Sequence, residues 1–319
     1  MTIPAAELRN LDLFAAGLAE AAPIAAHFTA CLSNDFKHDG PVARSVASQF
    51  TVTEDLFGIR LLAGVHWLVL KGQTPELSAH LRDHLTGATD SSYLHRAWEL
   101  VVQAVQEHPT EIRTALSRPV QQHQPRRAEA LLTGLTMLGA PRVRLLEIGA
   151  AAGINLMVDR FGWYGHGWEW GDPDSPMRLT SRGRPPGDLQ IVARAGCDLV
   201  PRDPGNPHDA LILQSFLPHE REIDRLELKE ALEVAADSPL RVDEADAVDW
   251  LEEQLAGPSD PYVHTVVWHS LFWLYLPPWK QRRIEELLAD AARRMPISRI
   301  CLEPRGWTSM PTLQLTVYS

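Results

Sequence analysis

Apolar residues in the first 140 positions recur at the spacing of amphipathic helices. Residues 53–72 begin with Thr53 as an N-cap candidate and end at Gly72, and residues 125–141 lie between two prolines. The segment 91–109 places its large apolar residues on one helical face: Leu94, Trp98, Val101, Val102 and Val105. Convincing strand-like alternation is lacking in this stretch of sequence, so we expect an all-helical N-terminal region.

The pattern changes after Pro141, where short apolar runs that suit buried strands alternate with helical segments. The strand candidates are residues 143–149, 167–172, 240–246, 297–304 and 312–319, together with the beginning of residues 262–276, where β-branched residues gather. The helix candidates are residues 154–162, 219–237, 247–256 and 277–295. We interpret residues 177–180 and 189–199 as an excursion similar to a hairpin.

This alternation predicts an α/β protein with a parallel sheet and helices on both of its faces. We therefore expect two domains, a helical domain over residues 1–140 and a Rossmann-like domain over residues 141–319. In such sheets ligands bind beyond the C-terminal ends of the strands. The residues that directly follow each strand candidate are accordingly the ones to inspect for a site.

The first strand candidate ends in a loop of small residues, Glu147-Ile-Gly149-Ala-Ala151-Ala-Gly153. Gly149 lets the backbone turn tightly, and the alanines keep bulk away from a ligand. The start of the following helix offers free N–H groups, and Glu147 suits a cationic centre or ribose hydroxyls. The spacing differs from the GxGxxG of dinucleotide binders and is typical of the first motif of S-adenosylmethionine-dependent methyltransferases. Close packing of strand against helix is the alternative interpretation.

Two further acids are candidates for holding this cofactor. Asp172 lies 25 residues beyond Glu147 (172 − 147), an offset at which a carboxylate commonly binds ribose hydroxyls. Glu169 competes for that role, and Asp172 can equally cap the turn GDPDSP. Asp246 opens the helix after residues 240–245, where it can accept the adenine amino group, serve as N-cap, or do both.

The fourth strand candidate ends in VVWHS, which brings Trp268 and His269 to the expected cleft. His269 is a candidate base near a methyl acceptor, and a structural role is the alternative. Trp268 is a candidate contact to the cofactor. Three more aromatic residues follow, and we interpret most of this cluster as core: Trp273, Tyr275 and Trp279. His264 and His269 are five positions apart and face opposite sides of a strand, so no metal site is expected.

Composition narrows the classes of partner. Apolar residues make up 45% of the chain, and 30 Lys plus Arg against 41 Asp plus Glu give a net charge of −11, which argues against nucleic-acid binding. Three scattered cysteines without a CxxC pattern predict neither a disulfide framework nor a zinc site. We expect a cytoplasmic protein without membrane attachment, because the sequence shows neither a signal-peptide pattern nor an apolar run of about 18 residues.

Several motifs occur in a fixed order: LLEIGAAAGINLMVDRFG, WGDPDSPMRL, RAGCDLVPRDP, DAVDWLEEQL, TVVWHSLFWLYLP and CLEP. From about His66 onward the sequence resembles an uncharacterised bacterial family, domain of unknown function 2332. The resemblance implies the fold of a class I methyltransferase, with a helical part before the cofactor-binding sheet. It implies this fold better than it implies a substrate.

The resemblance extends to individual positions. The matching residues are Glu147, Gly149, Ala151, Gly153, Asn155, Asp159, Arg160, Trp170, Gly171, Asp172, Pro173, Gly196, Cys197, Asp198, Pro201, Asp203, His269 and Ser270. Asp198 and Asp203 flank a turn that we expect to face the acceptor, with Asp198 as a second catalytic candidate beside His269. The family's QTNEVGR-like segment corresponds to residues 120–127, which retain Gln121 and Arg127 but carry His123-Gln124 in place of the Asn-Glu pair. The segment 215–221 also departs from the family pattern, and the sequence ends where that pattern leads us to expect a further turn and strand.

The sequence thus predicts methyl transfer from S-adenosylmethionine to an unknown small molecule, with S-adenosylhomocysteine as product. The helical domain would cover the acceptor pocket, with His66, Gln121, Arg127 and Asp203 as candidate substrate contacts. A catalytically inactive binding or regulatory protein is the second hypothesis, favoured by the altered segment 121–127. A different nucleotide such as NAD is the third, and the loop spacing counts against it. The acceptor atom and the oligomeric state stay open.

Overall fold

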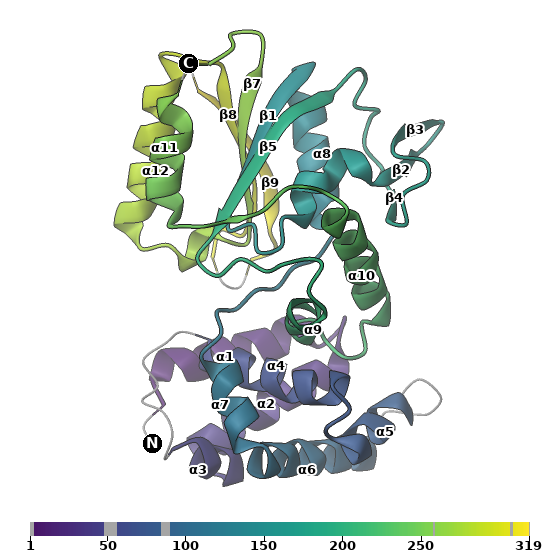
Figure 1. The fold of residues 1–319 in the computed structure, drawn as a ribbon. Helices are drawn as coiled ribbons and strands as arrows, with labels where there is room; N and C mark the ends of the chain where they lie inside the picture. The colour runs from purple at the N-terminus through teal and green to yellow at the C-terminus, as the bar shows by residue number, and fades with distance from the viewer. Residues whose placement is uncertain (1–2, 48–55, 84–89, 258, 307–308, 319) are drawn as a thin grey trace. The chain divides into compact units, whose positions relative to one another are not determined.

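The computed structural model describes residues 3–47, 56–83, 90–257, 259–306 and 309–318 (Figure 1). The chain forms two compact units, described separately below. The helical unit comprises Met1–His123 and Leu211–Arg225, and the sheet unit comprises Gln124–Ala210 and Leu226–Ser319. This division differs from the expected boundary at residue 140, because helix α8 (Arg127–Leu138) packs on strands of the sheet and a later segment returns to the helical unit.

The helical unit has the architecture that the spacing of apolar residues predicted. Its helices are α1 (Ala5–Leu18), α2 (Pro23–Lys37), α3 (Pro41–Ala47), α4 (Phe57–Leu70), α5 (Pro75–Asp83), α6 (Ser91–Glu107) and α7 (Pro109–Leu116). The proposed N-cap Thr53 lies outside the described residues. Two further helices, α9 (Pro207–Ser215) and α10 (Glu222–Ala236), each run across a boundary between the units.

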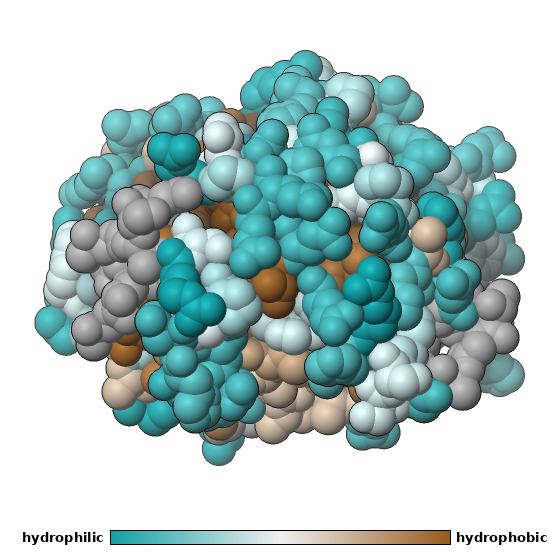
Figure 2. Space-filling view, turned by 90° about the horizontal axis from the view of Figure 1, so that it is seen from below, coloured by the Kyte–Doolittle hydropathy of each residue, from teal (hydrophilic) through white to brown (hydrophobic). Residues whose placement is uncertain are grey.

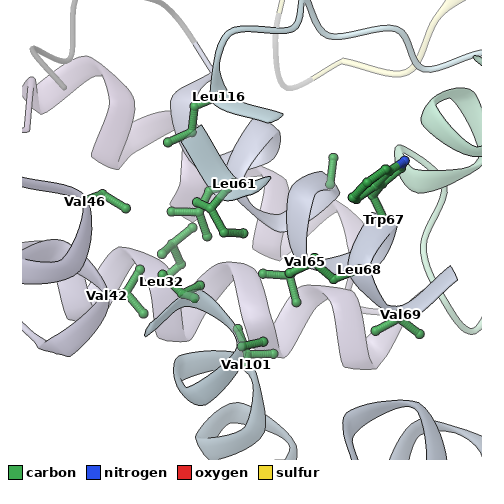
Figure 3. Close-up of a cluster of buried hydrophobic side chains, with 14 of the residues drawn as sticks. Leu32, Val42, Val46, Leu61, Val65, Trp67, Leu68, Val69, Val101 and Leu116 are labelled. Carbon is green, nitrogen blue, oxygen red and sulfur yellow. The ribbon is translucent and has the colours of Figure 1, made fainter. Parts of the chain in front are cut away.

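A continuous apolar core fills the helical unit. Leu32 of α2, Leu61 and Leu68 of α4 and Val101 of α6 are fully buried and belong to one cluster (Figure 3). Helix α4 is apolar on most of its circumference, which explains why α2, α6 and α7 all contact it. The unit therefore has a hydrophobic core of its own.

The sheet unit contains a six-stranded, mostly parallel sheet in the order β6-β5-β1-β7-β8-β9. Its strands are β1 (Arg142–Ile148), β5 (Gln190–Asp198), β6 (Asp243–Glu244), β7 (His264–Ser270), β8 (Ile297–Glu303) and β9 (Thr312–Tyr318). Only the pairing of β8 with β9 is antiparallel. Counted along the chain within this sheet, the order is 3-2-1-4-5-6, which reverses between β1 and β7. The predicted mixed α/β architecture with preceding helices is confirmed.

Helices cover both faces of this sheet (Figure 1). Helices α11 (Ala247–Ala256) and α12 (Pro278–Ala292) share one apolar cluster with Leu146 and Ile148 of β1 and Val267 of β7. Helix α8 and the short 3₁₀ helix η1 (Ile154–Arg160) contact each other and the sheet. Because side chains alternate along a strand, Glu147 and Trp268 project away from the face that α11 and α12 cover.

The interpretation of residues 177–180 and 189–199 as a hairpin-like excursion is wrong. The first segment is β4 (Arg178–Thr180), which joins β2 (Gly162–Gly165) and β3 (Trp168–Gly171) in a separate three-stranded sheet of order β3-β2-β4. The second segment is β5, a parallel neighbour of β1. Only the last two residues of β5 pair with β6, so its earlier part is largely exposed and lacks the apolar run of a central strand.

The segment after Leu240 matches the sequence prediction closely. Helices α11 and α12 and strands β7, β8 and β9 all lie where the pattern predicted them, although the strand expected over residues 240–246 is reduced to Asp243–Glu244. Across the described chain, no helix is both long and apolar enough to cross a bilayer. The face seen in Figure 2 is mostly hydrophilic, and its apolar residues appear in small separated areas.

Candidate functional site

The loop after β1 adopts a left-handed backbone at three positions. Gly149 and Gly153 both have φ of 70°, and Ala151 has φ of 48°. The loop is tied to the neighbouring strand β5: the Ala150 N–H donates to the Cys197 carbonyl at 2.9 Å, and the Ala151 N–H donates to Asp198 Oδ2 at 2.9 Å. Two of the loop's backbone donors are therefore already bonded to the end of β5.

The helix after the loop differs from the expectation. Residues 154–160 form the 3₁₀ helix η1, and Met157 departs from helical geometry within it. A seven-residue segment of this kind has only a weak dipole, since the dipole grows by the alignment of successive peptide units. The expected anion site at the start of an α-helix is therefore not formed.

Glu147 is the central charged group next to this loop. Its side chain is buried, and Asn155 Nδ2 donates to Glu147 Oε1 at 2.8 Å. Burial, with a contribution from the charge of Asp198, raises the pKa of Glu147 to about 8. Asn155, the Trp268 indole and the Arg127 guanidinium favour the ionised form and limit the rise.

Arg127 is a buried cation at the start of α8. Its pKa is lowered to about 10 by burial, and the charges of Tyr275, Glu303 and Glu147 oppose that change. Within the described residues its guanidinium forms no salt bridge. Substrate contact by Arg127 stays a prediction, and the structure brings its charge near Glu147.

His269 forms a buried pair with Glu303, the last residue of β8. His269 Nδ1 lies 2.7 Å from Glu303 Oε1, which also accepts the backbone N–H groups of Phe272 at 2.9 Å and Trp273 at 3.2 Å. The imidazole stacks on the Trp273 ring at 4.9 Å between centroids. Burial lowers the pKa of His269, and the Glu303 carboxylate opposes that shift. The pair thus fixes the orientation of the imidazole and the turn after β7.

Strand alternation places His269 and Glu147 on opposite sides of the sheet. Val267 packs with α11 and α12, and His269, two positions further along the strand, faces the same side. Trp268 lies between them in sequence and faces the other side, together with Glu147, which is its register partner on β1. The link between the two sides is Phe272, whose ring lies 6.1 Å from the His269 ring and against Gly149. A Cβ at Gly149 would lie 2.4 Å from Phe272 Cδ2, so glycine is required there by close packing.

Asp246 serves as the N-cap of α11, one of the two roles expected from the sequence. Its side chain accepts the Val248 N–H at 3.0 Å and forms an ion pair with Lys280. These contacts hold the pKa of the carboxyl below its ordinary value against the opposing effect of burial. The second role, binding of an adenine amino group, stays a prediction.

The structure does not bring Asp172 to the loop edge of the main sheet. Asp172 is exposed beside the three-stranded sheet, and its Oδ1 accepts the Asp174 N–H at 2.9 Å, as expected of a turn cap. Glu169 is exposed on β3 of the same sheet. Asp198 instead ends the strand beside β1, where its second oxygen accepts the Val200 N–H at 2.9 Å. Asp203 is exposed in the turn beyond it and caps the Gly205 N–H.

His66 and Gln121 belong to the helical unit, where both side chains are buried. His66 Nδ1 lies 3.1 Å from the Ser215 carbonyl oxygen, and its ring meets the His219 ring edge-on at 5.6 Å. Burial, together with the charges of His219 and Arg225, lowers the pKa of His66 to about 3. Substrate contact by His66 and Gln121 stays a prediction.

Glu303 was not predicted as a partner of His269. Its position in the sequence does indicate the contact, because Glu303 ends a predicted strand and the ends of parallel strands meet at one edge of the sheet. The aromatic core was also overestimated from the sequence: Trp268 is fully buried, but Tyr275 is 45% and Trp279 56% exposed. Among the residues described, no group of three or more His, Cys, Asp or Glu could hold a metal ion.

Comparison with known proteins gives one match. The model of a family described as "Uncharacterized protein conserved in bacteria (DUF2332)" matches residues 9–319. The chain belongs to this family. The match begins well before His66, so the family pattern includes the helical unit. No curated protein and no solved structure matches the chain.

Proposed function

We propose that the sheet unit binds S-adenosylmethionine and transfers its methyl group to a small-molecule acceptor. One observation carries the proposal: Asp198, which ends the strand next to β1, is bonded to Ala151 at the centre of the small-residue loop. A carboxylate at the end of this second strand is well placed to accept hydrogen bonds from ribose hydroxyls beside the loop. The role first expected of Asp172 is therefore assigned to Asp198.

The residues present fit such a cofactor. Bound S-adenosylmethionine supplies an electrophilic methyl group on a sulfonium. Glu147 would hold a cationic group of this ligand, Asp198 the ribose and Asp246 the adenine amino group, with Trp268 as apolar support. Three buried polar atoms near the loop, Glu147 Oε2, Asn155 Oδ1 and Trp268 Nε1, have no hydrogen-bond partner among the described residues, which is expected of groups that bind a ligand.

The protein's contribution to methyl transfer would be alignment of the acceptor with the methyl group. A base is needed only for a weakly nucleophilic acceptor. His269 is the candidate, because Glu303 holds Nδ1 and leaves Nε2 without a partner in the described structure. His269 lies on the α11 and α12 side of β7, with its ring 6.1 Å from the Phe272 ring.

Phe272 favours the second hypothesis, a methyltransferase fold that binds without turnover. The ring lies directly against Gly149, at the first turn of the loop. Removing the ring separates the two hypotheses. If Phe272 only gates access, Phe272→Ala will strengthen cofactor binding; if the site is inactive, the variant will bind the cofactor without transferring its methyl group to any acceptor tested.

A ligand panel tests the proposal. A ligand that binds only the folded protein stabilises it by RT ln(1 + [L]/Kd), about 2.7 kcal/mol at one hundred times Kd. S-adenosylmethionine and S-adenosylhomocysteine should raise the thermal unfolding midpoint, and NAD should leave it unchanged. A shift with NAD and none with either S-adenosyl compound would replace the proposal by the dinucleotide hypothesis.

A further inference from the structure

The contact between Glu147 and Asn155 leaves two oxygens without donors. Asn155 Nδ2 donates to Glu147 Oε1 at 2.8 Å, yet neither Glu147 Oε2 nor Asn155 Oδ1 has a partner in the part of the chain that the structure describes. Both side chains are 1% exposed. Two buried acceptors without donors are costly, about 1–3 kcal/mol each. Protonation of Glu147 would remove this cost, because the O–H group of the acid can donate to the Asn155 amide oxygen.

We propose that Glu147 rests as the neutral acid, with its Oε2–H donated to Asn155 Oδ1, and exchanges this proton for a cationic group of the ligand. The exchange rests on the proposed function, because it makes Glu147 the contact for an ammonium or sulfonium group. The proton leaves to solvent as the ligand's charge arrives, so the new carboxylate charge on Glu147 balances the cationic group and the site gains no net charge. Binding of such a ligand is therefore coupled to release of one proton.

The groups around Glu147 support both states. Burial and the charge of Asp198 on β5 disfavour the carboxylate and raise the pKa of Glu147 to about 8. Arg127 on α8, Asn155 on η1 and the Trp268 indole on β7 favour the carboxylate. Arg127 forms no salt bridge within the described chain, so it does not neutralise Glu147 by direct contact. The resting acid can consequently ionise once a second cation is present.

Infrared difference spectroscopy tests the resting state. At pH 6 the spectrum of the wild-type protein minus Glu147→Gln should contain the carbonyl band of a protonated carboxyl group. Asn155→Ala should shift this band, since the amide accepts the acid proton. The exposed Glu169→Gln serves as the matched control and should leave the band unchanged. Absence of a protonated-carboxyl band in the wild-type difference spectrum would overturn the proposal.

Calorimetry tests the exchange. Titration with S-adenosylhomocysteine, which carries an ammonium group, is repeated at pH 7 in buffers of different ionisation enthalpy. The dependence of the observed heat on that enthalpy should correspond to release of close to one proton by the wild type and of none by Glu147→Gln. Binding without proton release refutes the exchange and leaves the cofactor proposal intact. If no binding occurs in either buffer, the cofactor proposal fails and the exchange with it.

Discussion

Asp198 Oδ2 accepts the backbone N–H of Ala151 at 2.9 Å, so the end of β5 is bonded to the centre of the loop that follows β1. The same carboxylate accepts the Val200 N–H with its other oxygen. One side chain thus sets the conformation of two adjacent strand ends. The bond therefore joins the small-residue loop to the acid that we propose as the ribose contact.

Removal of the Asp198 carboxylate should destabilise the loop. Asp198→Ala leaves the N–H groups of Ala151 and Val200 without their acceptor. Each lost bond should lower the free energy of unfolding by no more than about 1–3 kcal/mol. Urea unfolding measures this change. Asp203→Ala is the control, because Asp203 is exposed and caps only the Gly205 N–H. Equal losses in the two variants would show that Asp198 has no special role in the loop.

Gly149→Ala should lower the free energy of unfolding in two ways that can be measured separately, through backbone strain and through a collision with Phe272. The left-handed φ of 70° strains any L-residue by roughly 1–2 kcal/mol, and the added Cβ would also collide with Phe272. Gly139→Ala measures the strain alone, since Gly139 has φ of 68° and open space at its Cβ position. Gly149→Ala should therefore destabilise more than Gly139→Ala in chemical unfolding.

The double variant Gly149→Ala with Phe272→Ala removes the collision but retains the backbone strain. After allowance for the effect of Phe272→Ala alone, the remaining loss should approach that of Gly139→Ala. If the loss at Gly149 is unchanged by truncation of Phe272, the ring does not pack on the loop. That result would also remove Phe272 as a gate to the cofactor.

His66 should make the helical unit sensitive to acid. Its pKa is about 3 in the folded protein against 6.5 for an ordinary histidine, so below pH 6.5 the unfolded chain binds a proton that the folded chain does not. Stability should fall with decreasing pH from 6.5 towards 3, by at most about 1.4 kcal/mol per pH unit from this group. His66→Gln should lose less stability over this range in pH-dependent urea unfolding.

The exposed residue His95, whose side chain is 75% exposed, provides the control for that comparison. His95→Gln should retain the acid sensitivity of the wild type. If His66→Gln and His95→Gln show the same pH dependence as the wild type, burial of His66 does not govern acid stability.

Glu303 should fix the tautomer of His269. With Nδ1–H donated to Glu303, nitrogen NMR should show Nδ1 as protonated and Nε2 as unprotonated at neutral pH. Glu303→Gln should preserve this tautomer, because two backbone N–H groups require an oxygen at the Oε1 position. Glu303→Ala should abolish it. The signals of His264, which contacts Ser298 instead, should not change in either variant. A proton on Nε2 in the wild type would remove His269 as a base.

The sequence was sufficient for much of the fold. Helix α11 was predicted correctly from Asp246 and the apolar spacing after it, and β7 from its β-branched run, since both signals are local. Residues 189–199 were expected in a hairpin-like excursion, and their place beside β1 was missed because many residues of β5 are exposed and the strand lacks a continuous apolar run. The acid beside the loop could not be predicted from position along the chain. A three-stranded sheet is inserted between β1 and β5, so the carboxylate bonded to the loop is that of Asp198, 51 residues beyond Glu147 (198 − 147).

The site itself was predictable only in part. Glu147, Gly149, Ala151 and Gly153 lie together as expected, because one short loop holds them. The contacts of Glu147 with Asn155 and of His269 with Glu303 depend on which face of the sheet each side chain occupies, and this follows from strand register rather than from composition. The conformation of the Phe272 turn has no sequence signature, because Leu271 adopts a φ of 48° that its residue type does not favour.

Calorimetric titration of the full chain with S-adenosylhomocysteine measures cofactor binding without knowledge of the acceptor. We expect saturable binding to one site with a dissociation constant in the micromolar range, weakened in Asp198→Ala. No detectable heat at millimolar ligand would contradict it, and the residues of the loop would then serve close packing against Phe272 and β5.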